Sequence, residues 1–140
     1  MTVVDASSEL TLADYQALAR FRAALRAFLQ FSEQAARGAG LTPAQHQLVL
    51  AVKGWEGGGM PSISDLAVAL RLRHHSAVEL VARAEEAGLV TRVADPGDGR
   101  RQLLALTARG DELLAKLVDL HRDELRRFRQ ETLADLLDVI

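Results

Sequence analysis

The sequence has 140 residues, which is long enough for one well-buried core and short for two. Aromatic residues make up only 4% of it, so leucine, valine and alanine must fill that core, and the absence of cysteine excludes disulfide bonds, zinc-thiolate sites and thiol-based redox sensing. The net charge of −2 argues weakly against a nucleic-acid partner, but arginines and histidines gather in the central third of the chain and acidic residues near its end. Judged by charge alone, such a basic cluster is an ordinary solvated surface.

No apolar run approaches the roughly 20 residues of a membrane span. Residues 1–5 also lack the basic start and apolar body of a secretory signal. We therefore expect a cytoplasmic protein without a membrane partner.

Residues 11–37 are predicted to form a long amphipathic helix that ends near Gly38. Its apolar stripe consists of Leu18, Phe21, Leu25, Phe28 and Leu29.

A second helix is predicted from Thr42, with Pro43 at its first position and Gln45 placed to close a capping box. Its apolar face carries Leu48, Val52 and Trp55. The glycines 57–59 then break the chain. No strand precedes them and no Gly-Lys-Ser/Thr follows, so they favour a connector over a phosphate-binding loop.

Two closely joined helices follow. The first starts at Ser62 and buries Leu66, Ala67 and Leu70, and the second covers residues 73–87 and ends at Gly88 in the left-handed position. This spacing predicts a helix-turn-helix unit.

Residues 89–94 and 102–106 are predicted to form a tight hairpin. The intervening residues 95–101 contain a proline and two glycines suited to sharp bends, and they place Arg100 and Arg101 at the tip. Thr107 is positioned to cap a last helix, which is predicted to break near Gln130.

Several motifs in this stretch occur together, at separations typical of one family. They are Leu66-Ala67, Leu72, Val81, Gly88-Leu89-Val90, Asp98-Gly99-Arg100 and Leu106-Thr107-Ala108-Arg109-Gly110. On these motifs the chain resembles the MarR family of bacterial winged helix-turn-helix regulators over nearly its whole length. The resemblance implies an obligate homodimer held by its terminal helices, recognition helices in successive major grooves, wings over the flanking minor grooves, and ligand-controlled repression.

The predicted fold is mainly α with a small antiparallel β wing, a winged helix-turn-helix with N- and C-terminal dimerisation helices. We expect a single domain over residues 1–140. Residues 11–37 and 108–140 are the expected dimerisation helices, and residues 42–106 are the expected DNA-binding core.

Two positions depart from the family pattern. Arg71 stands where a glycine is common, so the turn needs either another geometry or a left-handed residue, at a cost of roughly 1–2 kcal/mol. Arg73 stands where Ser, Thr or Asp usually caps the recognition helix, so a cap worth about 1 kcal/mol is lost. Both changes add positive charge where phosphates would lie.

The exposed first turn of the recognition helix carries His74, His75 and Ser76, which can reach base edges. Adjacent histidines can also suggest a metal site. However, neighbours on a helix point about 100° apart and no cysteine or acidic cluster completes a coordination sphere, so we predict DNA contact and no metal.

Arg100 matches the family's minor-groove arginine, and Asp98 resembles the acidic residue that orients it. Outside that motif, Arg100 would be an ordinary exposed turn residue. The full set of predicted DNA-binding residues is Arg71, Arg73, His74, His75, Ser76, Asp98, Arg100 and Arg101.

His46 and Trp55 are the candidate ligand-binding residues. His46 stands where relatives commonly carry a bulky aromatic near the ligand cavity, and Trp55 lies further along the same predicted helix. Either can instead be a core residue, which is the more frequent outcome for an interior histidine. His121 lies in an apolar stripe and is expected to be an interface residue rather than a sensor, although its titration range would permit a pH response.

We therefore expect a homodimeric transcriptional regulator that binds a pseudo-palindromic operator in double-stranded DNA, represses, and is released by a small molecule, for which aromatic compounds are one candidate class. No cofactor is expected. An enzyme is not expected, because no activated nucleophile, carboxylate pair or cofactor motif can be found. The alternative is a winged-helix protein-interaction module that does not read DNA, which would have little reason to keep the charge of the wing and first turn.

Overall fold

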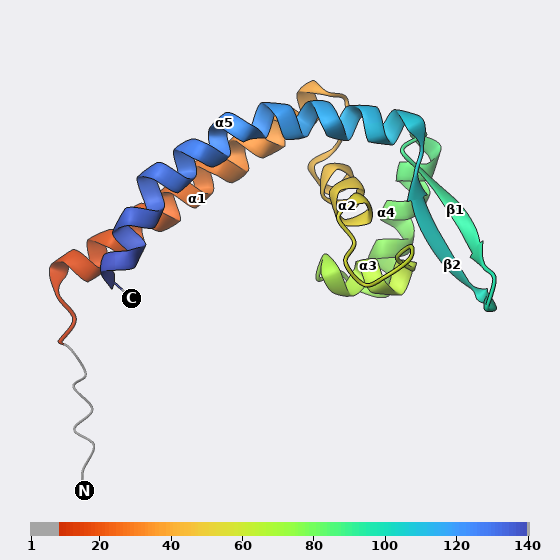
Figure 1. Ribbon diagram of the computed structural model, residues 1–140, viewed down its shortest axis with the longest axis horizontal. Coiled ribbons are helices and arrows are strands. Elements are labelled where there is room, and N and C mark those ends of the chain that lie inside the picture. The colour runs from red at the N-terminus through yellow and green to blue at the C-terminus, as the bar shows by residue number, and fades with distance from the viewer. Residues whose placement is uncertain (1–8, 140) are drawn as a thin grey trace, which may run out of the picture. The chain divides into compact units, whose positions relative to one another are not determined.

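A computed structural model describes residues 9–139, with side chains described as far as Thr132 (Figure 1). Its elements are α1 (Leu12–Gly38), α2 (Pro43–Lys53), α3 (Ile63–Ala69), α4 (His74–Glu86), β1 (Val90–Asp95), β2 (Asp98–Leu106) and α5 (Ala108–Val139). This mainly α architecture with one antiparallel two-stranded sheet confirms the predicted fold class. The predicted break near Gln130 is wrong: α5 is continuous there, because Gln130 and Glu131 are good helix formers and no glycine or proline interrupts them.

The described residues fall into two compact units, 32–121 and 9–31 with 122–139, so α1 and α5 each contribute to both. The core of the 32–121 unit is aliphatic. Leu48, Leu66, Val81, Leu104 and Leu117 from five different elements are fully buried in it. Leucine, valine and alanine therefore fill this core, as the low aromatic content requires.

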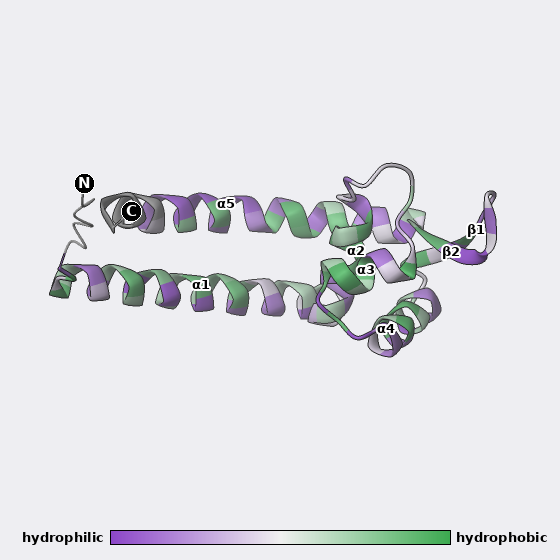
Figure 2. Cartoon of the chain, turned by 90° about the horizontal axis from the view of Figure 1, so that it is seen from below, coloured by the Kyte–Doolittle hydropathy of each residue, from purple (hydrophilic) through white to green (hydrophobic). Residues whose placement is uncertain are grey.

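In the other unit, Phe21 and Phe28 of α1 pack against Phe128 of α5, with ring centroids 6.2 and 5.7 Å apart. Large apolar side chains nevertheless remain exposed on this unit: Leu12, Tyr15, Leu18, Leu29 and Leu125. Figure 2 shows hydrophobic and hydrophilic residues alternating along both long helices. Within the described residues, no helix is long and apolar enough to cross a membrane. Within the expected dimerisation helix of residues 108–140, the side chains of residues 133–140 lie outside those that the structure describes.

The hairpin is more irregular than predicted. β1 and β2 pair regularly from Val90 with Leu106 to Ala94 with Gln102, after which the register shifts and Asp95 pairs with Asp98. The turn itself is only residues 96–97, closed by the Gly97 N–H donating to Asp95 Oδ1 at 2.9 Å. The prediction that Arg100 and Arg101 lie in the turn is therefore wrong, because both belong to the irregular start of β2. Irregularities of this kind bend a strand and redirect its side chains.

The start of α5 explains the Leu-Thr-x-x-Gly motif. Thr107 caps the helix by accepting the Gly110 N–H at 3.0 Å, and its own N–H donates to the Leu89 carbonyl at 3.0 Å. Its hydroxyl also donates to the carbonyl of Gly88. A Cβ at Gly110 would lie 2.1 Å from the Leu89 carbonyl oxygen, so only glycine allows this close approach.

Candidate nucleic-acid interface

The turn between α3 and α4 adopts the left-handed alternative considered above. Arg71 has φ of 55° and is the one residue other than glycine with positive φ among those described. The turn still closes, because the Leu72 N–H donates to the Ala67 carbonyl at 2.8 Å and the Arg71 N–H to the Val68 carbonyl at 3.1 Å. The strain of a non-glycine residue here is about 1 kcal/mol or more.

The N-terminus of α4 has no side-chain cap. Arg73 occupies the N-cap position in an extended conformation but its side chain makes no capping hydrogen bond, and the first turn contains no acidic residue. The first N–H groups of a helix have no partner inside the helix, so a cap, water or an external acceptor must satisfy them. Because Arg71, Arg73, His74 and His75 are all exposed, this end of α4 is open to an anion.

The three predicted base-reading residues face different surroundings. His74 lines a cleft between α3, α4 and the wing, while Ser76 is partly buried and lines a second cleft with Gln45 of α2 and its N-cap Thr42. His75 is exposed. The structure thus brings His74 to the wing side and places Ser76 on the opposite side of α4.

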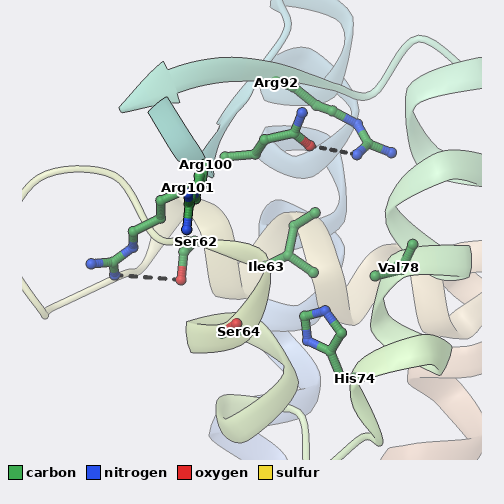
Figure 3. A pocket seen from close by; sticks show the side chains of 9 residues that line it. Ser62, Ile63, Ser64, His74, Val78, Arg92, Arg100 and Arg101 are labelled. Atoms are coloured by element: carbon green, nitrogen blue, oxygen red, sulfur yellow. Dashed lines mark hydrogen bonds between the residues drawn. The ribbon is translucent and has the colours of Figure 1, made fainter. Parts of the chain in front are cut away.

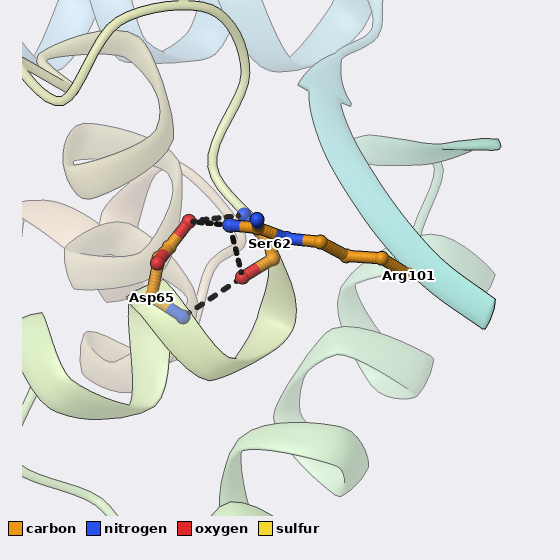
Figure 4. A network of polar contacts seen from close by, with 3 residues as sticks. All are labelled: Ser62, Asp65 and Arg101. Carbon is orange, nitrogen blue, oxygen red and sulfur yellow. Dashed lines mark hydrogen bonds and ion pairs between the residues drawn. The ribbon is translucent and has the colours of Figure 1, made fainter. Parts of the chain in front are cut away.

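Arg101 is held by α3 rather than free at the wing tip (Figure 4). Its Nη2 lies 2.9 Å from Asp65 Oδ2, and it also donates to Ser62 Oγ at 3.4 Å. Ser62 and Asp65 in turn form a capping box, each accepting the other's backbone N–H. The Ser62 backbone N–H is the largest of the interactions that lower the pKa of Asp65, and Arg101 adds to them, so the carboxylate stays charged.

Arg100 lies exposed on the wing. No partner for its guanidinium occurs among the described residues, although its backbone N–H donates to Asp98 Oδ1 at 3.0 Å. Asp98 therefore fixes the backbone at Arg100 and leaves the guanidinium free to contact an external group.

Arg92 was missed by the sequence reasoning. From β1 it donates to Gln102 Oε1 of β2 at 2.7 Å, and its Nε lies 3.4 Å from Glu85 Oε1 at the end of α4. The hairpin register could have suggested the contact with Gln102. A residue two positions along the partner strand from the directly paired residue is a diagonal neighbour, within reach of a long side chain. The contact with Glu85 depends on how α4 packs on β1, which a local motif does not reveal.

These side chains surround a cleft of about 260 Å³ (Figure 3). Its polar lining comes from α4, the wing and the start of α3: His74, Arg92, Arg100, Arg101, Gln102, Ser62 and Ser64. Ile63 and Val78 form its apolar wall next to His74. Among the described residues no carboxylate lines the cleft, so the arrangement suits an anion.

His46 is buried beside His121, with ring centroids 5.3 Å apart. His121 is also buried: its Nδ1 donates to the Leu117 carbonyl at 2.6 Å and its Nε2 lies 2.9 Å from Ser32 Oγ. Burial, and to a smaller extent the His121 imidazole, lowers the pKa of His46, so the neutral form of His46 is favoured.

Trp55 does not lie on the second helix, so that part of the prediction is wrong. α2 ends at Lys53, and Gly54 caps it by donating its N–H to the Leu50 carbonyl. Trp55 instead packs over Gly57 and lines a cleft of about 340 Å³ with the wing residues Asp95, Arg101 and Leu103. His46 does not line that cleft.

A helix-turn-helix unit followed directly by a two-stranded wing defines a winged helix-turn-helix protein. The sequence model of the MarR family matches residues 39–101. A proposed transcriptional regulatory protein for the hcr operon of Thauera aromatica is 33% identical over 96 residues, which are 69% of this chain and 56% of that protein.

Solved structures agree. AbsC, a MarR family transcriptional regulator from Streptomyces coelicolor, is 26% identical with a TM-score of 0.69 over 85% of this chain and 80% of its own. The M. tuberculosis regulator MOSR, solved in complex with DNA, is also 26% identical, with a TM-score of 0.61 over 78% of this chain and 77% of its own. In sequence and in fold the chain is similar to the MarR family of winged-helix transcriptional regulators.

Proposed function

We propose that the chain is a homodimeric, sequence-specific DNA-binding regulator that represses its target genes and is released by a small ligand. The observation that carries the proposal is an exposed, uncapped N-terminus of α4 beside a wing whose Arg100 guanidinium has no partner among the described residues. Helix N–H groups and arginines bind phosphate, and exposed residues of the first turn can read base edges. The DNA-bound structure of MOSR supports this proposal, because it shares the fold.

Selection from a random-sequence duplex library tests sequence recognition. We expect the purified protein to enrich a pseudo-palindromic site and to bind it more tightly than a scrambled duplex in fluorescence anisotropy. Arg100→Ala should weaken both affinities and make the salt dependence shallower, because one phosphate-neutralising cation is lost. His75→Ala should mainly reduce the preference for the selected site. If no sequence is enriched by folded protein, the chain is better described as a protein-interaction module.

The homodimer is supported by the apolar side chains exposed in the unit of residues 9–31 and 122–139. Leu18 is 56% exposed and Leu29 47% exposed, although both are large and apolar. Contiguous exposed apolar residues usually mark an interface. Light scattering of Leu18→Glu should therefore show a monomer. Leu50→Glu is the matched control: Leu50 is 43% exposed on α2, outside that unit, and its variant should remain dimeric.

Two clefts support release by a small ligand. The clefts beside Trp55 and beside Ser76 have volumes of about 340 and 360 Å³, which fall within the range of small-molecule sites. Trp55 is the sole tryptophan, so its fluorescence reports binding in its own cleft. Salicylate is titrated into the complex of the protein with its duplex. Trp55 fluorescence then reports binding in its cleft, and the anisotropy of the duplex reports whether DNA is released. Unchanged affinity for salicylate in His46→Ala would remove His46 from the ligand site.

A further inference from the structure

The cleft beside Trp55 lies between the wing and the connector of residues 54–62, and we call it the Trp55 cleft. Its lining combines one indole, two carboxylates, one guanidinium and the apolar side chains of two further residues: Trp55, Asp65, Asp95, Arg101, Met60 and Leu103. Such a mixture of aromatic, apolar and charged groups suits a small aromatic ligand that carries a charge of its own. The balance of charge in the cleft decides the sign of that ligand.

The charges that line the Trp55 cleft do not cancel. Arg101 is paired with Asp65, since its Nη2 lies 2.9 Å from Asp65 Oδ2. Asp95 accepts the N–H of Gly97 at 2.9 Å, but among the described residues no cation lies within ion-pair distance of its carboxylate. The cleft therefore carries one unbalanced negative charge, and it favours a cation over an anion such as salicylate.

The indole of Trp55 is held in place by the connector. A Cβ at Gly57 would lie 2.5 Å from the indole ring, so the absence of a side chain at Gly57 lets the ring lie against the backbone. The ring is partly buried and loses little freedom when a ligand binds. Tryptophan binds cations better than other aromatic side chains, because the face of its ring is electronegative. Trp55 and Asp95 thus supply the two groups that recognise an aromatic cation.

A cation in this cleft would also act on the wing, because Arg101 belongs to both the Trp55 cleft and the cleft that contains His74. The ion pair between Arg101 and Asp65 joins β2 to α3 (Figure 4). The two side chains are 49% and 29% exposed, so the pair is weak enough for another cation to compete. A ligand cation beside Asp65 attracts the carboxylate and repels the guanidinium. The wing is then held less firmly against α3.

We propose that the Trp55 cleft binds a small aromatic cation, of the aryl amidinium or aryl ammonium class, and that this ligand weakens DNA binding by competing with Arg101 for Asp65. The inference rests on the proposed function and gives the releasing ligand a site and a chemical class. Because coupling between two ligands is reciprocal, bound DNA weakens binding of the cation by the same factor.

Three compounds of nearly the same shape test the ligand class: benzamidine is a cation, benzamide is neutral and benzoate is an anion. Each is titrated at pH 7 and followed by the fluorescence of Trp55, the sole tryptophan. We expect benzamidine to bind roughly tenfold more tightly than benzamide, and benzoate to bind more weakly than both. Benzamide or benzoate binding as tightly as benzamidine would overturn the inference.

Variants locate the bound cation. Asp95→Asn should weaken benzamidine binding roughly tenfold and leave benzamide binding unchanged, whereas Asp95→Glu keeps the charge and most of the affinity. Glu56→Gln is the matched control: Glu56 is exposed next to Trp55 in sequence but does not line the cleft, so its affinity should stay within about twofold of wild type. Circular dichroism confirms folding. Trp55→Leu, measured by calorimetry, is an independent variant and should weaken benzamidine binding about fivefold.

Anisotropy of a labelled duplex, selected from the random library, tests the coupling. Saturating benzamidine should weaken duplex binding by wild type roughly threefold to fivefold, compared with sodium chloride at equal ionic strength. Arg101→Gln removes the cation that competes for Asp65, so it should bind benzamidine at least as tightly as wild type. Whatever its own duplex affinity, benzamidine should no longer change it.

The outcomes separate this inference from the proposed function. Unchanged benzamidine affinity in folded Asp95→Asn and Trp55→Leu places the ligand elsewhere and overturns the inference. Duplex affinity that ignores bound benzamidine, or that falls equally in Arg101→Gln, overturns the coupling through Arg101 while leaving DNA binding intact. A folded protein that selects no duplex but binds benzamidine through Asp95 overturns the proposed function and supports the ligand class of the cleft.

Discussion

The helices α3 and α4 are neighbours in the helix-turn-helix unit, yet their N-termini are built in opposite ways. α3 begins with a capping box between Ser62 and Asp65, and its carboxylate also binds Arg101 from the wing. α4 begins with Arg73, which makes no capping hydrogen bond, after a left-handed Arg71. The first N-terminus is satisfied within the protein, whereas the second is left for an external acceptor. The interactions that stabilise a helix end are thus concentrated in α3, which supports the wing. The groups left available for binding DNA are concentrated at the start of α4.

The largest expected effect comes from breaking the α3 end. Asp65→Ala removes a cap and an ion pair together, so the free energy of unfolding should fall by about 2 kcal/mol. Urea unfolding at pH 7 measures the loss. Arg101→Gln keeps the capping box and removes only the ion pair, so its loss should be less than half as large. Equal losses in the two variants would show that the capping box contributes little.

Lowering the pH should reproduce part of this loss in the wild type. The folded protein holds the pKa of Asp65 below its ordinary value of 3.8, so the unfolded chain binds the proton more readily. The stability contributed by Asp65 is present above pH 3.8 and is lost as pH falls through the lower folded pKa. Unfolding curves of wild type and Asp65→Asn should therefore converge as the pH falls below that value. A stability difference that stayed constant down to the acid limit would contradict the assigned role of the carboxylate.

Converting the α4 end into a capped one should produce a smaller and opposite change. Arg73→Ser supplies the missing side-chain acceptor, so the free energy of unfolding should rise by about 1 kcal/mol. The same change removes a cation and occupies a helix N–H, so duplex affinity should fall roughly fivefold. Thermal unfolding and anisotropy measure the two effects. A variant that gained stability and kept full affinity would show that the open N-terminus has no part in binding.

The smallest effect is expected at the turn. Arg71→Gly relieves the left-handed strain but loosens the unfolded chain, so the net gain in stability should be below about 1 kcal/mol. Arg71→Ala is the control, because alanine keeps the strain and removes only the charge. If both variants weaken duplex binding equally, the charge of Arg71 contributes to binding and its backbone conformation does not.

The parts of the fold that could be predicted from sequence are those specified within a few residues. Thr42 and Gln45 form the expected capping box, Gly88 has φ of 75°, and Thr107 caps α5. In each case one turn of backbone determines the conformation and the residue type matches it. Local pattern therefore located the helices and the hairpin closely.

The candidate site depended on contacts that no local pattern encodes. Arg101 reaches Asp65, 36 positions away in sequence, and the hairpin irregularity that permits this contact was hidden within a glycine-rich turn. Trp55 matched the helical spacing of Leu48 and Val52, but Gly54 ended the helix first. The sequence thus named Arg100 and Arg101 of the wing without showing that Arg101 is already paired with Asp65.

Gly110 has a consequence for genetics. It contacts no DNA-facing residue discussed above, yet a side chain there would collide with the Leu89 backbone at the junction where the wing begins and α5 starts. A random screen for loss of regulation should therefore return substitutions at Gly110 alongside those at Arg100. The former should be distinguished by low protein abundance in the cell, and the latter by normal abundance. Immunoblotting such a collection would separate residues that maintain the architecture from residues that use it.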